Sequence, residues 1–173
     1  MTEDFVILVD KNDLQIGLMP KTEAHQKAML HRAISVFIFN KKGDWLIQRR
    51  ALTKYHSAGL WTNTCCTHPL PNESNVEAAN RRLLQEMGMH CELTEIFDFI
   101  YKEKLDNELT EYELDHVFVG TTDALPIPNP NEVMEYNYVP IETILKHIDQ
   151  APLEYTVWFK KIVERVEAHV KGL

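Results

Sequence analysis

Two adjacent cysteines, Cys65 and Cys66, precede His68 in the segment WTNTCCTHP, which runs from Trp61 to Pro69. These residue types fit three arrangements: a structural zinc site, a pair of small buried residues, or a reactive thiol beside a metal ligand. Structural zinc sites use spaced pairs such as C-x-x-C that are repeated at a distance, whereas the only other cysteine is Cys91. A thiol with an ordinary pKa of about 8.5 is protonated near neutral pH but can still exchange its proton. The pattern favours a reactive thiol and does not distinguish Cys65 from Cys66.

Three carboxylates recur at every second position of the segment EYELDHVF: Glu111, Glu113 and Asp115. On a β-strand this spacing places all three on one face, where like charges repel. Either that face lies in water, which the stretch by itself favours, or a cation gathers the carboxylates. The apolar run that follows favours partial burial, where unpaired carboxylates are costly. A bound metal ion would resolve this conflict.

Imidazoles for such a site are available from three places along the chain, at His25, His31 and His68. Together with two carboxylates they would form a mixed site of about five nitrogen and oxygen ligands, which suits Mn, Zn, Fe or Mg. His25 and His31 are six residues apart, so they lie on different faces of any regular helix. We therefore expect the chain to bend or change structure between them.

The composition restricts the class of protein. The chain has 173 residues, 45% of them hydrophobic, and a net charge of −8, which indicates one globular domain and opposes a nucleic-acid partner. Two basic segments, IQRRALTK and NRRLL, can still hold a small anion. No apolar run is long enough for a membrane span, and the first ten residues carry acids where a signal peptide is positively charged. We expect an intracellular protein with free thiols, because three cysteines suggest no disulfide framework.

Hydrophobic periodicity predicts the elements that must position these residues. FVILVD (5–10) and ISVFIFN (34–40) indicate strands, and KKGD followed by WLIQRRA (45–51) indicates a hairpin. A helix is expected from Ser74, which forms a capping-box pattern with Glu77, to Gly88.

The second half of the chain continues this mixture. EIFDFIYK (95–102) and EYELDHVFVGT (111–121) indicate strands, followed by a proline-rich loop at 124–132. Pro140 precedes or begins a short helix through IETILKHI. A final amphipathic helix carries one apolar face, formed by Tyr155, Trp158, Phe159, Ile162, Val163 and Val166. Strands with flanking helices predict a layered α/β domain.

Several of these segments, in this order, resemble the type I isopentenyl diphosphate isomerases of the Nudix superfamily over nearly the whole chain. The matching stretches are LHRAISVFIFN, LIQRRALTK, GLWTNTCCTHP, ESNVEAANRRLLQEMG, EYELDHVF and NEVMEY. The resemblance implies a single Nudix-type α/β/α sandwich with a mixed β-sheet, covering residues 1–173. It also implies an N-terminal arm (1–31) that contributes ligands to a core (32–173).

The segment from Thr67 to Gly88 resembles a degraded Nudix box, which in hydrolytic relatives reads G-x5-E-x7-R-E-U-x-E-E-x-G-U. The chain keeps Glu73, Arg81, Glu86 and Gly88 but has Thr67 in place of the first Gly and Arg82 and Gln85 in place of two of the Glu residues. Two metal-binding carboxylates of the hydrolases are therefore missing. Fewer anionic ligands hold fewer metal-bound waters, which argues against diphosphate hydrolysis.

The resemblance also implies two metal positions. The family's site of three histidines and two glutamates corresponds to His25, His31, His68, Glu111 and Glu113, for Mn²⁺, Zn²⁺ or Mg²⁺. A second ion, Mg²⁺, would bridge the substrate diphosphate and Glu86, with help from the main-chain carbonyl of the catalytic cysteine. The diphosphate-binding positions of the family correspond to Lys21, Arg50, Lys54 and Arg82, whose cations suit phosphate oxygens.

The family reaction is a reversible 1,3-allylic shift between isopentenyl and dimethylallyl diphosphate through a tertiary cation-like state. The resemblance assigns the two proton-transfer groups to Cys66 and Glu113, with Tyr101 relaying or orienting the proton. Trp158 would offer its π face to the cation, and Trp61 would form a wall of the pocket. Which of Cys66 and Glu113 acts as the acid in each direction stays open.

Two other functions compete with the isomerase. A Nudix hydrolase of a nucleotide or other diphosphate fits less well, because of the eroded box. A metal-stabilised binding module explains the histidines and glutamates but not a thiol and basic clusters beside them. We expect a cytoplasmic monomer that binds a small isoprenoid diphosphate, with no nucleic-acid or membrane partner.

Overall fold

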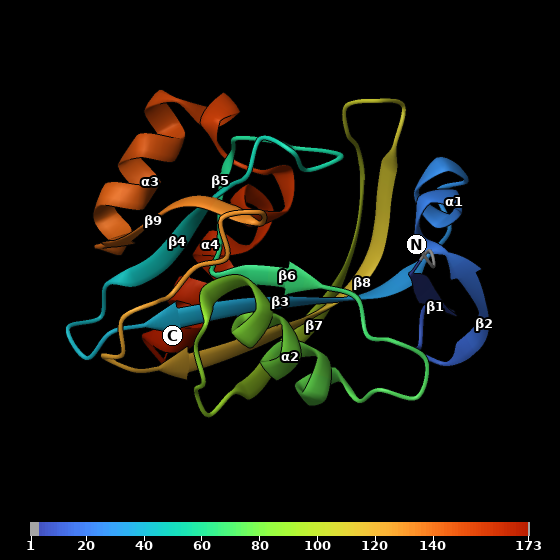
Figure 1. Cartoon of the computed structure of the whole chain (residues 1–173), viewed down its shortest axis with the longest axis horizontal. Helices are drawn as coiled ribbons and strands as arrows, with labels where there is room; N and C mark the ends of the chain where they lie inside the picture. Colours follow the sequence, from blue (N-terminus) through green and yellow to red (C-terminus); the bar gives the residue numbers. More distant parts are fainter. Residues whose placement is uncertain (1–3, 173) are drawn as a thin grey trace.

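The computed structural model describes residues 4–172, so the first three residues of the predicted arm and Leu173 lie outside it. Its strands form one mixed sheet (Figure 1). The strands are β1 (Phe5–Val9), β2 (Gln15–Pro20), β3 (His31–Phe39), β4 (Trp45–Arg50), β5 (Trp61–Thr62), β6 (Cys65–Thr67), β7 (Thr94–Lys104), β8 (Thr110–Thr121) and β9 (Val133–Val139). The helices are α1 (Lys21–Gln26), α2 (Asn75–Met87), α3 (Ile141–Gln150) and α4 (Val157–Val170), with a 3-10 turn at Pro152–Glu154.

Strand β3 is the centre of the sheet. It pairs parallel with β8 and antiparallel with β1, β4 and β6, and the long β7–β8 hairpin extends beyond the body of the sheet (Figure 1). Ile34, Val36 and Ile38 face helix α2, whereas Phe37 and Phe39 face α3 and α4. This alternation is the period of two expected for a strand with both faces buried. The predicted α/β/α sandwich with a mixed sheet is confirmed.

Most elements lie where the periodicity predicted them. The five predicted strands correspond to β1, β3, β4, β7 and β8, and the three predicted helices to α2, α3 and α4. Pro140 is the N-cap of α3, and Gly88 ends α2 with φ of 61°. Strands β2, β5, β6 and β9 and helix α1 were not predicted. Tyr155 was placed on the last helix, but it precedes α4 and forms an isolated bridge with Trp61.

Helix α2 begins with a complete capping box. The Ser74 side chain accepts a hydrogen bond from the Glu77 backbone N–H, and the Glu77 carboxylate accepts one from the Ser74 backbone N–H. Ser74→Ala should lower the free energy of unfolding by about 1 kcal/mol, because it leaves an N-terminal backbone donor without its acceptor. In a chain of this length the loss corresponds to about 2–4 °C in Tm. Thermal unfolding by circular dichroism measures it, and Ser74→Thr, which keeps the hydroxyl, is the control.

No helix among residues 4–172 is long and apolar enough to span a membrane.

Candidate active site

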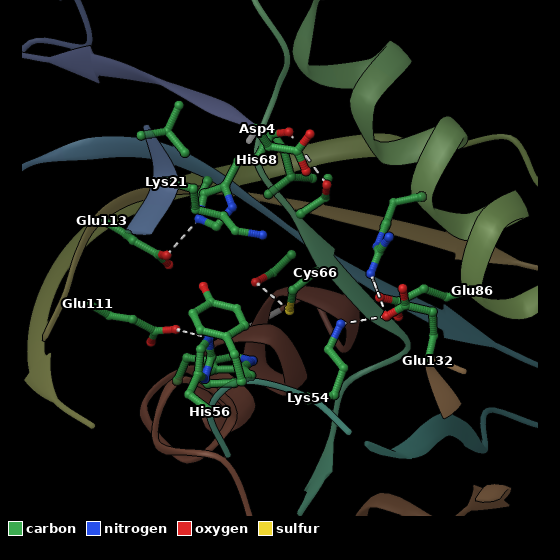
Figure 2. A pocket seen from close by; sticks show the side chains of 18 of the residues that line it. Asp4, Lys21, Lys54, His56, Cys66, His68, Glu86, Glu111, Glu113 and Glu132 are labelled. Atoms are coloured by element: carbon green, nitrogen blue, oxygen red, sulfur yellow. Dashed lines mark hydrogen bonds and ion pairs between the residues drawn. The ribbon is translucent and has the colours of Figure 1, made fainter. Parts of the chain in front are cut away.

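A cavity of about 350 Å³ opens beside β3, β6 and β8. Cys66 and Glu113 both line it, as do Glu111, Tyr101 and Trp158. Figure 2 shows Glu111 and Glu113 on one side of Cys66, and Lys54, Glu86 and Glu132 on the other. The cavity therefore has a carboxylate and histidine end, a cationic end, and a thiol between them.

Strand alternation separates the two cysteines. In the register of β3 and β6, Val36 pairs with Cys65 and Ser35 pairs with Cys66. Cys65 consequently points into the core beneath α2 and is fully buried, whereas Cys66 points to the opposite face and reaches the cavity. The structure thereby distinguishes the two thiols, which the residue pattern alone did not.

The same alternation gathers the carboxylates. In the parallel pairing of β3 with β8, His31 lies opposite Glu113 and Ala33 lies opposite Asp115. Glu111, Glu113 and Asp115 have exposed fractions of 4%, 5% and 1%, so the alternative of a water-exposed face is wrong. Asp115 accepts a 2.7 Å hydrogen bond from Ser35 Oγ and lies outside the residues that line the cavity.

The Cys66 thiol lies among polar side chains. Its Sγ lies 3.2 Å from Asn63 Nδ2 and 3.6 Å from Ser35 Oγ. Burial, and then the nearby charge of Asp115, raises the pKa of the thiol above its ordinary value. Cys66 is therefore a neutral thiol that holds a proton at the wall of the cavity.

This raised pKa predicts slow alkylation of Cys66. The thiolate is the reacting species, so a raised pKa leaves less of it at pH 8 than a free thiol has. Iodoacetamide should modify Cys66 more slowly than free cysteine, and the rate should still rise above pH 9, where free cysteine approaches its plateau. Mass spectrometry of the peptide that contains Cys66 measures the rate, and a plateau near pH 8 would contradict the expectation.

Three histidines direct Nε2 toward Glu113. The distances to Glu113 Oε1 are 3.9 Å from His25, 3.4 Å from His31 and 3.0 Å from His68. The Nδ1 atoms of His25 and His31 donate to the Lys21 and Met29 carbonyls, so their Nε2 atoms carry the lone pair. These two buried Nε2 atoms have no hydrogen-bond partner among the described residues.

These residues fit a divalent metal ion. Bonds of about 2.1 Å put neighbouring ligands of an octahedral ion about 3 Å apart and opposite ligands about 4.2 Å apart, and the three distances to Glu113 Oε1 lie in this range. Buried nitrogen lone pairs without a partner are costly unless an ion binds them. His25, His31, His68 and Glu113 are therefore a candidate metal centre.

The chain bends between the first two of these histidines, as expected. Helix α1 ends at Gln26, Ala28 has a positive φ of 51°, and β3 begins at His31. The rings of His25 and His31 consequently meet with centroids 4.9 Å apart. The change from helix to strand permits a contact that a regular helix forbids.

Glu111 lies beside this group rather than within it. Its donor atom groups with those of His25 and His56, and its Oε2 lies 2.8 Å from the Tyr101 hydroxyl, which is also 2.6 Å from Glu113 Oε2. A phenol has one proton and can donate to only one of these carboxylates at a time. Burial and the charge of Glu113 raise the pKa of Glu111.

All four basic residues expected from the sequence, Lys21, Arg50, Lys54 and Arg82, line the cavity. Lys54 and Arg82 lie at its cationic end with Glu132, whereas Arg50 lies beside His56 and Trp158. Glu132 Oε2 lies 2.5 Å from Lys54 Nζ and 2.9 Å from Arg82 Nη2. Burial lowers the pKa of Lys21. An anion with several oxygens can bind here by replacing the carboxylate contacts of these cations.

The two tryptophans of the prediction lie in different surroundings. Trp158 on α4 lines the cavity, its Nε1 donates to Asn63 Oδ1 at 3.3 Å, and Arg50 Cζ lies 5.3 Å from its ring. Trp61 does not line this cavity, contrary to the expectation. Trp61 is partly buried and packs against the core cluster that includes residues of α3 and α4.

Four residues of the site were not singled out from the sequence: Ser35, His56, Asn63 and Glu132. Asn63 belongs to the WTNTCCTHP segment and Glu132 to NEVMEY, so the resemblance contained both. No sequence motif marks Ser35 or His56. They reach the site through strand pairing and through the loop between β4 and β5.

The sheet lies between helices, and a glutamate of helix α2, Glu86, lines the cavity. The NUDIX domain model matches residues 29–160. DR0079 from Deinococcus radiodurans superposes with a TM-score of 0.78 at 20% identity, covering 94% of this chain and 98% of that one. This likeness shows the shared fold.

Closer relatives define the particular family. Isopentenyl-diphosphate Delta-isomerase 2 of Photorhabdus laumondii is 52% identical over 93% of this chain and 91% of the relative. Isopentenyl-diphosphate Delta-isomerase of Pectobacterium atrosepticum is 50% identical over 93% of this chain and 90% of the relative. The chain belongs to the isopentenyl-diphosphate Delta-isomerases of the Nudix family.

The structure also shows what replaces the lost carboxylates of the Nudix box. Arg82, at one of those positions, lies with Nη2 2.5 Å from Glu86 Oε1. Arg81 and Glu73 form an ion pair at 2.6 Å, and Arg81 also donates to the His68 carbonyl. The box thus keeps one cavity carboxylate, Glu86, and uses Arg81 to hold the segment that carries His68.

Proposed function

We propose that this protein interconverts isopentenyl diphosphate and dimethylallyl diphosphate by adding a proton at one end of the allylic unit and removing one at the other. The observation that carries the proposal is that Cys66 and Glu113 line one cavity, together with four cations that can hold a diphosphate. The family membership supports the same reaction.

In this proposal, the basic residues bind the substrate, and the thiol and the carboxylate transfer protons. Lys21, Arg50, Lys54 and Arg82 bind the diphosphate and fix the hydrocarbon between the thiol and the carboxylate. One of Cys66 and Glu113 protonates an end carbon while the other removes a proton from the opposite end, and the roles exchange in reverse. Holding both groups in advance removes much of the entropic barrier.

Tyr101 and Trp158 support these transfers. The Tyr101 hydroxyl, 2.6 Å from Glu113 Oε2, orients that carboxylate or relays its proton. Trp158 presents a buried ring at the cavity wall, and a desolvated π face can stabilise a cation by about 2 kcal/mol. A dry cavity also protects the cation-like state from capture by water.

Two ions complete the proposed site. His25, His31, His68 and Glu113, with Glu111 beside them, would hold Mn²⁺, Zn²⁺ or Mg²⁺, whose positive charge offsets the buried carboxylates. Glu86, with the Cys66 carbonyl, would hold the Mg²⁺ that accompanies the diphosphate. We place the enzyme in the cytoplasm as a monomer, in which residues 1–31 form an arm on a 32–173 core.

Incubation with isopentenyl diphosphate and divalent metal in deuterated water, followed by NMR, tests the proposal. An isomerase gives dimethylallyl diphosphate with deuterium in the new methyl group. Release of phosphate or diphosphate without an allylic product would indicate a hydrolase instead, and an unchanged spectrum would indicate a binding module.

A further inference from the structure

His56 is a buried imidazole beside the metal centre without a role in the proposed reaction. It lies in the loop between β4 and β5, lines the cavity and is 6% exposed. Its Nε2 lies 3.8 Å from Glu111 Oε1, the contact drawn in Figure 2. This distance is too long for a hydrogen bond. It lies between the roughly 3 Å and 4.2 Å that separate two ligands of one octahedral ion.

The orientation of the His56 ring matches that of two other histidines of the centre. His56 Nδ1 lies 3.2 Å from Ser57 Oγ, just as His25 and His31 engage backbone carbonyls through Nδ1. Ser57 Oγ can accept the Nδ1 proton, and the tautomer with that proton on Nδ1 leaves the Nε2 lone pair for a metal. All three rings therefore direct Nε2 toward a carboxylate of β8.

His25 connects His56 to the centre. The donor atoms of His25, His56 and Glu111 lie within 4.8 Å of one another, and His25 also belongs to the group formed with His31, His68 and Glu113. His25 is fully buried, and its Nε2 has no hydrogen-bond partner among residues 4–172. An ion bound at this unpartnered nitrogen would therefore lie next to His56 and Glu111 as well as to the other three ligands.

The His56 ring is held in place from several sides. Arg50 Nη2 donates to the His56 carbonyl at 3.1 Å. The next backbone N–H, of Ser57, donates to the Asp106 carboxylate at 3.3 Å, at the tip of the β7–β8 hairpin. The His56 ring also packs edge-on against Trp158, with centroids 5.8 Å apart. These contacts hold the His56 ring with its Nε2 toward Glu111.

We infer that His56 is a fourth imidazole ligand of the metal centre and that, with His25, it brings Glu111 into the coordination of a divalent ion. The inference rests on the metal centre of the proposed function and deepens it. A fourth nitrogen donor favours ions that bind imidazole well, such as Zn²⁺ or Fe²⁺, over Mg²⁺.

The test is NMR of the full chain labelled with ¹⁵N-histidine, titrated with Zn²⁺ alone. Coordination changes the chemical shift of the bound ring nitrogen, so each imidazole reports separately and no catalysis is needed. We expect the Nε2 signals of His25, His31, His56 and His68 to shift together, and the exposed His90 to stay unchanged. The spectrum of His56→Gln identifies the His56 signal by its absence.

The affinity for Zn²⁺ gives a second readout, measured by competition with a chelating indicator. His56→Gln should weaken binding by about tenfold or more, and His90→Gln should not. If the other three histidines shift and His56 does not, His56 is not a ligand although the metal centre stands. If no histidine shifts, both the metal centre and this inference are wrong, while the deuterium experiment still decides the isomerase activity.

Discussion

Cys66→Ala should lower kcat by about 10³-fold, because loss of a positioned proton-transfer group typically costs between about 10² and 10⁴. Among residues 4–172, the Cys66 thiol is the one sulfur that lines the cavity. The variant should bind Zn²⁺ with unchanged affinity, since Cys66 belongs to no group of candidate metal ligands in residues 4–172. Steady-state kinetics with isopentenyl diphosphate and a metal titration measure the two effects.

Cys65→Ala is the matched control. Its side chain lies in the core with Ala78, Leu83 and Met87, so the substitution removes only a small buried group. We expect about 1 kcal/mol or less of lost stability and nearly unchanged turnover. An inactive Cys65→Ala enzyme beside a fully active Cys66→Ala enzyme would reverse the assignment of the two thiols.

The sequence was informative where side chains alternate regularly. Strands β3 and β8 and helix α2 bury regular faces, and their periodicity predicted them. Strand β2 has exposed Ile16 and Leu18, and β9 has exposed Met134. Backbone pairing with β1 and β4 holds these two strands, and such pairing leaves no hydrophobic period in the sequence.

The site was less accessible to sequence reasoning because strand pairing assembles it. The spacing of Glu111, Glu113 and Asp115 predicted a shared face, but not which histidine lies opposite. His31 meets Glu113 because β3 and β8 run parallel in one register, which depends on the whole fold. The arrival of His56 beside Glu111 depends on a loop conformation, and loops carry no periodic signal.

Glu113→Gln should lower both turnover and Zn²⁺ affinity, whereas Cys66→Ala should lower turnover alone. The carboxylate faces His25, His31 and His68 through Oε1 and accepts from Tyr101 through Oε2. An amide removes the negative charge and places donor or acceptor atoms where the ion and the proton require a carboxylate. We expect about a 10³-fold or greater loss of kcat together with weaker Zn²⁺ binding.

The combination of Cys66→Ala and Glu113→Gln distinguishes concerted from separate roles. Residues that act as a unit lose little more when both are removed than when one is removed, so the double variant should be about as slow as the slower single one. Glu135→Gln is the control, because Glu135 is 54% exposed on β9 and makes only a 3.6 Å ion pair with Arg49. Two losses that multiply would show that thiol and carboxylate act in independent steps, and the shared transition state proposed for them would have to be abandoned.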